Sequence, residues 1–171
     1  MHSTRYLFLF IFFIHAINLS SQQPASPLEA SFEKYKKMKE ESRYKLDWIS
    51  LGPTVNSARA DIVQVDPFHP GTMYAGFGSG GIWKTINNGV SWSCIFEQQS
   101  APGIGDMELA PSNSSVIYVG TGENLKKPRN FTLPGTGMYR SDDAGKTWKH
   151  IGLEDSWSIA EIAIHPKDPN T

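Results

Sequence analysis

From Trp48 onward, hydrophobic and polar residues alternate over short runs, and Gly, Pro, Asn or Asp separates one run from the next. A period of two with such punctuation predicts short β-strands joined by tight turns, and almost no helix. Three of the runs resemble one another because each is an alternating strand that ends in a proline turn. They cover residues 61–67, 105–111 and 160–166. We therefore expect a repeated, all-β unit.

The runs that follow these strands also recur at constant spacings. Residues 72–76 match residues 116–120, which lie 44 positions later, and residues 81–85 match residues 137–141, which lie 56 positions later. The second repeat therefore carries 12 extra residues, which fall within residues 123–136. A fourth pair of matching runs covers residues 92–96 and 148–152.

Four short strands per repeat predict the blades of a β-propeller, because a sheet this small must stack on its neighbours to cover its faces. The third copy ends at Thr171, where its second strand should begin. We therefore expect an incomplete propeller whose partners include the remaining blades of its own chain. A β-sandwich is the main alternative, although the regular repeat disfavours it.

The chain before Trp48 has a different pattern. Leu28, Phe32, Tyr35 and Met38 recur at helical spacing among Glu and Lys, which predicts one amphipathic helix. We expect this helix to pack against the following domain or to act as a pro-segment, with binding to a partner as the alternative. The predicted organisation is a signal peptide over 1–21, a linker and helix over 22–47, and propeller blades over 48–171.

The first residues have the order of a secretory signal. Arg5 precedes an apolar run at positions 6–17, and no acidic residue occurs before Glu29. The run is shorter than the ~20 apolar residues of a membrane span, so we expect cleavage and secretion into the cell envelope or beyond, with an uncleaved anchor as the alternative. The single cysteine, Cys94, excludes an internal disulfide.

Charge and composition exclude several functions. With 16 basic and 17 acidic residues the formal charge is −1, which offers nucleic acid no electrostatic footprint. The five histidines show no paired spacing typical of metal ligands. We therefore predict no metal, no cofactor, no nucleic-acid partner and no membrane span after cleavage of the leader.

One eight-residue segment stands out, Ser141-Asp-Asp-Ala-Gly-Lys-Thr-Trp148, and Thr85-Ile-Asn-Asn-Gly-Val-Ser-Trp92 is its weaker copy. The aspartate can accept hydrogen bonds from its own turn, and the glycine permits positive φ. The tryptophan offers a large face to bury between sheets, with an N–H that can find a carbonyl. The residues assigned this structural role are Ser141, Asp143, Gly145, Thr147 and Trp148, with Thr85, Asn87, Gly89, Ser91 and Trp92.

This segment resembles the Asp-box of BNR repeats at every fixed position, and Asn87 replaces the aspartate in the copy. A catalytic role for Asp142 or Asp143 is disfavoured, since a turn aspartate lacks the cleft and partner that acid–base chemistry needs. Residues 48–171 as a whole are similar to exported bacterial BNR-repeat, glycosyl hydrolase-like proteins. The phrases that carry this resemblance are residues 48–53, 74–76, 80–84 and 118–123, with 57–59 as a departure from the usual Gly-Gly-Arg.

The resemblance implies a propeller shared with sortilin-type receptor domains and with xyloglucan-cleaving glycosidases. Those glycosidases carry a catalytic aspartate between a tyrosine and two glycines, whereas residues 75–79 contain no carboxylate. We therefore favour a non-catalytic scaffold that binds a protein, peptide or glycan at the propeller face, and assign no catalytic residue. The alternative is part of a secreted glycoside hydrolase whose carboxylates lie in other blades.

The inserted loop of the second repeat holds the candidate ligand-binding residues. Glu123 follows a strand end, where the loops of a propeller gather, and Arg129 lies in the same loop. A solvated or turn-capping glutamate is the alternative interpretation.

Overall fold

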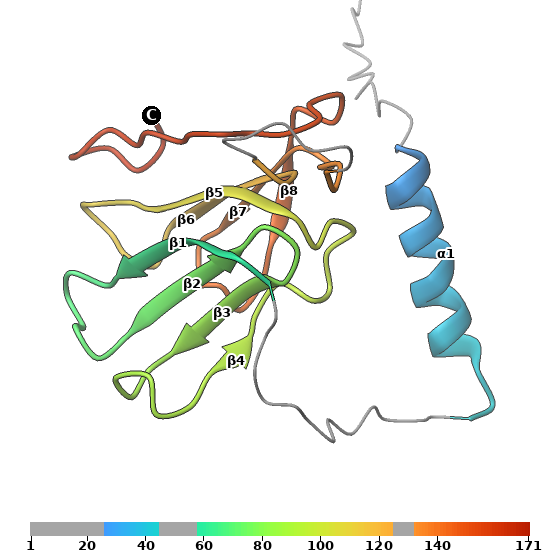
Figure 1. Ribbon diagram of the computed structural model, residues 1–171, viewed down its shortest axis with the longest axis horizontal. Helices are drawn as coiled ribbons and strands as arrows, with labels where there is room; N and C mark the ends of the chain where they lie inside the picture. Colours follow the sequence, from blue (N-terminus) through green and yellow to red (C-terminus); the bar gives the residue numbers. More distant parts are fainter. Residues whose placement is uncertain (1–25, 45–57, 125–131) are drawn as a thin grey trace, which may run out of the picture.

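The structure is a computed structural model that describes residues 26–44, 58–124 and 132–171 (Figure 1). This part of the chain contains one helix and two antiparallel four-stranded sheets. The elements in chain order are α1 (Pro27–Glu41), β1 (Ala60–Val65), β2 (Met73–Phe77), β3 (Gly81–Thr85), β4 (Ser93–Cys94), β5 (Ile104–Leu109), β6 (Ile117–Thr121), β7 (Met138–Ser141) and β8 (Lys149–Gly152). The prediction of a mostly β chain with four-stranded units is confirmed.

Each sheet is a simple meander in which strands adjacent in sequence pair with one another. The first sheet has the order β1-β2-β3-β4 and the second β5-β6-β7-β8. The register repeats as well: Val63 pairs with Ala75 and Ala75 with Trp83 in the first sheet. At the same positions of the second sheet, Met107 pairs with Val119 and Val119 with Tyr139. The two sheets are therefore structural copies, as the repeated spacing predicts.

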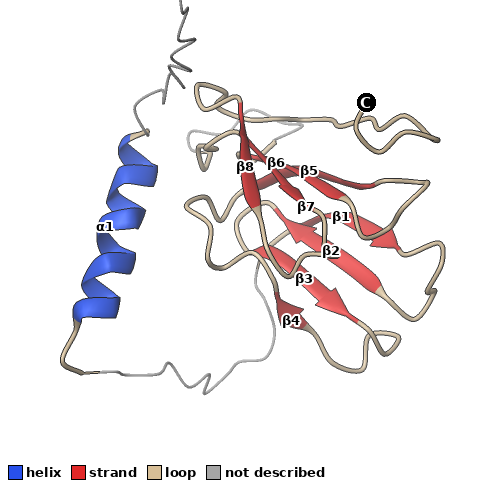
Figure 2. Ribbon diagram, turned by 180° about the vertical axis from the view of Figure 1, so that it is seen from behind, coloured by secondary structure: helices blue, strands red, loops and turns tan. Residues whose placement is uncertain are grey.

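The hydrophobic core lies between the two sheets, which Figure 2 shows from behind. Ile62 and Ile82 face it from the first sheet, and Met107 and Val119 face it from the second. Gly76 leaves room for the side chain of its partner in β1: a Cβ there would lie 2.9 Å from Ile62 Cδ1, whereas Ile104 Cγ2 of the second sheet would lie at an ordinary contact distance of 3.5 Å. Burial of such side chains is the main favourable term in holding the sheets together.

The prediction of a third strand over residues 160–166 is wrong. The structure has no strand there, and this segment instead crosses the second sheet (red in Figure 1). It is held by isolated hydrogen bonds, such as Ile159 N–H to Thr121 O at 3.1 Å and Tyr118 Oη–H to Pro169 O at 2.9 Å. Alternating residues form a strand only where a second strand completes the hydrogen-bond ladder, and the described residues provide none beside this segment.

The predicted amphipathic helix is present as α1, although it ends at Glu41. Ser26 and Glu29 form a capping box around its first turn, and Pro27 occupies a position where its missing N–H has no cost. No residue of α1 is buried; its carboxylate at Glu29 lies 3.8 Å from Nε2 of His150 in the second sheet. No helix among the described residues is long and apolar enough to cross a membrane. The predicted signal peptide and residues 48–53 lie outside the described residues.

Candidate functional site

A charged cluster joins the two sheets where their loops meet at one end. Arg59 lies just before β1 and Asp61 lies within it, whereas Glu123 follows β6. The Arg59 guanidinium donates from Nε to Asp61 Oδ1 at 2.6 Å and from Nη2 to Glu123 Oε1 at 3.2 Å. Arg59 therefore bridges two carboxylates that are far apart in the sequence.

The loop between β2 and β3 closes over this cluster at Gly78. The Gly78 N–H donates to the carbonyl of Arg59 at 3.1 Å. A Cβ at Gly78 would lie 2.8 Å from Arg59 Nη2, 2.9 Å from Asp61 Oδ2 and 3.3 Å from Glu123 Cγ. The three charged side chains thus fill the space that a side chain at position 78 would need.

The electrostatics of the cluster follow from the central guanidinium. Its hydrogen bond to Asp61 raises the pKa of Arg59 above the ordinary value, with a smaller contribution from Glu123. The side chains are 38%, 26% and 12% exposed for Arg59, Asp61 and Glu123. The cluster carries one net negative charge and presents both donors and acceptors toward solvent.

Glu123 is less free than the sequence suggests. Its Oε2 accepts a hydrogen bond from Leu133 N–H at 3.3 Å, and its own N–H donates to Leu133 O at 2.9 Å. These bonds fasten the far end of the inserted loop to the end of β6. Arg129, the other predicted ligand-binding residue, lies outside the described residues. The partners that the sequence analysis missed are Arg59 and Asp61.

An exposed tryptophan contacts residues that neighbour Glu123 and Leu133. Trp157 leaves 63% of its surface accessible, and its indole N–H donates to Thr132 Oγ1 at 2.9 Å. The carbonyl of Trp157 accepts a hydrogen bond from Gly135 N–H at 2.8 Å. The same carbonyl oxygen packs against Gly122, the residue before Glu123. A Cβ at Gly122 would collide with this oxygen. The Trp157 backbone therefore lies against the residue that precedes Glu123, and its indole bonds to the residue that precedes Leu133.

The turn that resembles an Asp-box lies between β7 and β8 and takes no part in this cluster. Asp143 Oδ1 accepts hydrogen bonds from Thr147 N–H at 2.8 Å and from the Ser141 hydroxyl at 2.8 Å, and Oδ2 accepts one from the Thr147 hydroxyl at 2.6 Å. These bonds, those from Thr147 first, lower the pKa of Asp143 to about 2. Both carboxylate oxygens bond within the turn, which suits a structural role.

The copy between β3 and β4 uses an amide in the same way. Asn87 Oδ1 accepts from Ser91 N–H at 2.9 Å, whereas its Nδ2 donates to Ser91 Oγ at 2.9 Å. The first-position hydroxyls also match: Thr85 Oγ1 accepts from Gly89 N–H at 3.0 Å and Ser141 Oγ from Gly145 N–H at 2.9 Å. Asn87 thus accepts a backbone N–H as Asp143 does. In the side-chain contact the direction is opposite, because Asn87 donates to the Ser91 hydroxyl whereas Asp143 accepts from the Thr147 hydroxyl.

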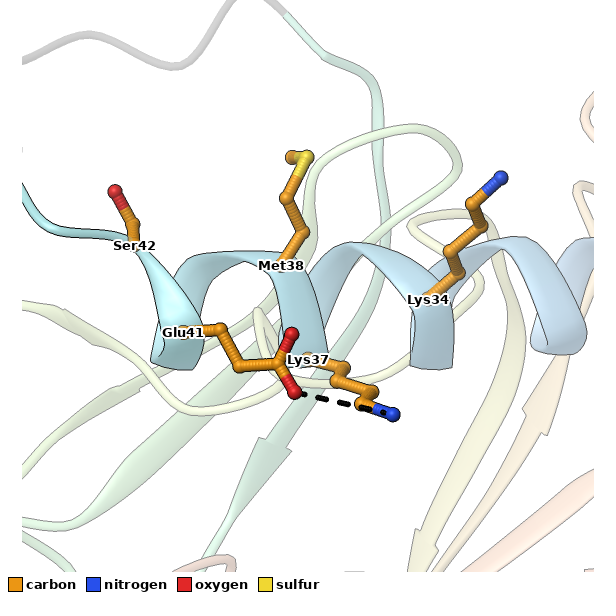
Figure 3. Close-up of a pocket in the computed structure, with 5 residues that line it drawn as sticks. All are labelled: Lys34, Lys37, Met38, Glu41 and Ser42. Atoms are coloured by element: carbon orange, nitrogen blue, oxygen red, sulfur yellow. Dashed lines mark ion pairs between the residues drawn. The ribbon is translucent and has the colours of Figure 1, made fainter.

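A shallow groove of about 550 Å³ runs along one side of α1 (Figure 3). It is lined by Lys34, Lys37, Met38, Glu41 and Ser42. Lys37 and Glu41 form an ion pair of 3.8 Å across it. All of these residues come from the helix and its C-terminal cap, so the groove brings together no groups from different elements. Within the described residues, no three His, Cys, Asp or Glu side chains are grouped to hold a metal ion.

No protein-family model matches this chain. A probable oligoxyloglucan-reducing end-specific xyloglucanase from Neosartorya fischeri is 28% identical over 109 residues, which cover 61% of this chain and 12% of that protein. The chain therefore spans about an eighth of the length of this curated relative.

Two solved structures were matched as well. A GH74 enzyme from Niastella koreensis has a TM-score of 0.42 and 24% identity, over 54% of this chain and 13% of that one. A GH74 xyloglucanase from Xanthomonas campestris has a TM-score of 0.41 and 20% identity, over 53% and 15%. The sequence match to the Neosartorya fischeri protein makes this chain a distant relative, over a small part of its length, of a xyloglucanase.

Proposed function

We propose that this chain is part of an exported, xyloglucanase-like β-propeller, and that its Arg59–Asp61–Glu123 cluster binds a glycan without cleaving it. The observation that carries the proposal is the packing of these three side chains around Gly78. In the glycosidases that the sequence resembles, the stretch around this position supplies a catalytic aspartate. In this chain residues 75–79 contain no carboxylate, and the charged groups around Gly78 come from Arg59, Asp61 and Glu123.

The bridging arginine argues against hydrolysis at this cluster. Cleavage of a glycosidic bond requires one carboxyl to be protonated as the general acid while a second acts as nucleophile or base. Both carboxylates of the cluster bond to the same guanidinium, Asp61 at 2.6 Å and Glu123 at 3.2 Å. An oxygen atom of each carboxylate is therefore engaged by Arg59, whereas hydrolysis needs two carboxyl groups directed at the scissile bond.

The same groups suit the recognition of sugar hydroxyls. A hydroxyl both donates and accepts hydrogen bonds, and the cluster presents guanidinium N–H donors next to carboxylate acceptors. Bonds to charged partners are the stronger kind. Since Arg59 and Asp61 keep part of their surface accessible, a ligand can reach them without disrupting the sheets.

The similarity to a xyloglucanase also favours a second candidate, in which the chain belongs to an active glycoside hydrolase whose catalytic carboxylates lie in other blades. In that case the cluster serves as one part of a longer substrate groove. A third candidate is a propeller face that binds a protein or peptide. No contact within the described residues supports it.

Calorimetric titration of the chain with xyloglucan heptasaccharide tests the proposal, with reducing-end release measured in parallel. We expect binding without hydrolysis, and binding weakened by Glu123→Gln and by Arg59→Ala. Asp142→Asn is the matched control, because this carboxylate is 66% exposed and pairs with Arg140 away from the cluster. Absence of binding would contradict the glycan proposal, and hydrolysis that disappears in Glu123→Gln would show that the cluster is catalytic.

A further inference from the structure

We infer that Trp157 is the stacking platform of this glycan site, on which the apolar face of one pyranose ring lies flat. The inference rests on the proposed function, since it names the residue that would hold a sugar beside the charged cluster. Trp157 is 63% exposed, and an indole combines a large apolar face with an N–H donor, which is why tryptophan is enriched at binding interfaces.

The indole is held in a fixed orientation before any ligand arrives. Its N–H donates to Thr132 Oγ1, and its backbone carbonyl accepts from Gly135 N–H. The next residue, Ser158, donates from its hydroxyl to Gly122 O at 3.0 Å. A ring restrained at both the side chain and the backbone loses little freedom on binding, which favours affinity.

The internal repeat shows that this rim position stays accessible when a complete sheet follows it. Pro102 precedes β5 in the same way that Trp157 precedes residues 160–166, and its carbonyl accepts from Gly81 N–H at 2.9 Å. Pro102 is exposed although β5 belongs to a fully formed sheet. Exposure of Trp157 therefore follows from its place at the rim. The fold accepts a proline there, so packing of the repeat does not require an indole.

Two short connections tie the indole to the charged cluster. Thr132, which accepts the indole hydrogen bond, is followed by Leu133, whose N–H donates to Glu123. On the other side, the Trp157 carbonyl packs against Gly122, which precedes Glu123. A pyranose with equatorial hydroxyls exposes axial C–H groups to an aromatic face and directs its hydroxyls sideways. On Trp157, those hydroxyls would be directed toward donors and acceptors at the rim.

The test compares Trp157→Ala and Trp157→Phe with Trp92→Ala, a matched control that removes another partly exposed tryptophan. Each variant is titrated with xyloglucan heptasaccharide by calorimetry and by tryptophan fluorescence. We expect Trp157→Ala to weaken binding by about tenfold, in line with the energy of an aromatic contact, and Trp157→Phe to weaken it less. The ligand-induced change in emission should persist in Trp92→Ala and disappear in Trp157→Phe.

Thr132→Val is a second route that leaves the indole in place. It removes the acceptor of the indole hydrogen bond, and we expect a several-fold loss of affinity with unchanged thermal stability. If the wild-type chain binds and Trp157→Ala binds equally well, the stacking role is wrong while the proposed function stands. If the wild-type chain and Trp92→Ala both fail to bind, the proposed function fails and the stacking role fails with it.

Discussion

The indole N–H of Trp148 donates a 2.7 Å hydrogen bond to the carbonyl of Ile95, and this bond joins the second sheet to the first. The ring also meets Phe96 edge-to-face, with 5.1 Å between centroids. Trp92 occupies the equivalent position of the first repeat, but it donates to Gly89 O in its own turn at 3.2 Å and is 38% exposed. The tryptophan of this motif therefore lies at the interface between the sheets in the second repeat and at the surface in the first.

Replacing Trp148 by Ala should therefore lower the free energy of unfolding by ~3–5 kcal/mol, the range for removing a large aromatic from a packed interface. Trp92→Ala should cost much less, because no second sheet covers this ring among the described residues. Asp142→Ala should change stability by no more than ~0.5 kcal/mol. Urea unfolding followed by circular dichroism measures all three, and equal losses from Trp148 and Trp92 would contradict the assigned interface.

Substitution of Ala144 in the second turn should increase the stability of the fold. Its φ is +59°, beside Gly145 at +86°, whereas the equivalent Asn88 has φ +56°. A left-handed conformation costs a residue with a Cβ roughly 1–2 kcal/mol, and Asn tolerates it better than Ala. We expect Ala144→Asn to raise the melting temperature and Asn88→Ala to lower it. Differential scanning calorimetry would reveal the opposite signs.

Asp143 should make stability depend on pH in an acidic window. Hydrogen bonds from Thr147 lower its pKa to about 2 in the folded chain, below the ~3.9 of an unfolded chain. The carboxylate therefore stabilises the fold above about pH 4, and this contribution is lost as the pH falls toward 2. We expect the stability difference between wild type and Asp143→Asn to shrink between pH 6 and pH 2.5. Asp142→Asn is the control for removing a neighbouring carboxylate that makes no hydrogen bond to Thr147.

Gly122 should tolerate no side chain. Its φ is +95°, and a Cβ would collide with the carbonyl of Trp157 and lie 2.7 Å from Ser158 Cα. We expect Gly122→Ala to destabilise the chain by at least ~2 kcal/mol and to release residues 154–171 from the second sheet. Limited proteolysis would detect faster cleavage in that segment. Gly152→Ala is the control for positive φ alone, because nothing lies within 4 Å of its added Cβ.

The sequence by itself determined the strands and the turns between them. The alternating runs around Val63, Val119 and Tyr139 became paired strands, and the segments at Asn87 and Asp143 became hairpin turns. These features depend on residues within one hairpin, so local periodicity and turn chemistry are enough to specify them. The spacings of 44 and 56 residues then identified the two sheets as copies.

Only the tertiary structure decided which side chains meet. Glu123 was a candidate from its place after a strand, but its partner Arg59 lies 64 residues away in the sequence. The contacts of Gly78 with both depend on how three separate loops converge, which no local pattern records. The alternation at residues 160–166 predicted a strand that did not form, because a strand needs a neighbour to complete its hydrogen bonds. Periodicity specifies which residues are able to pair, whereas the packing of the sheets decides whether a partner is there.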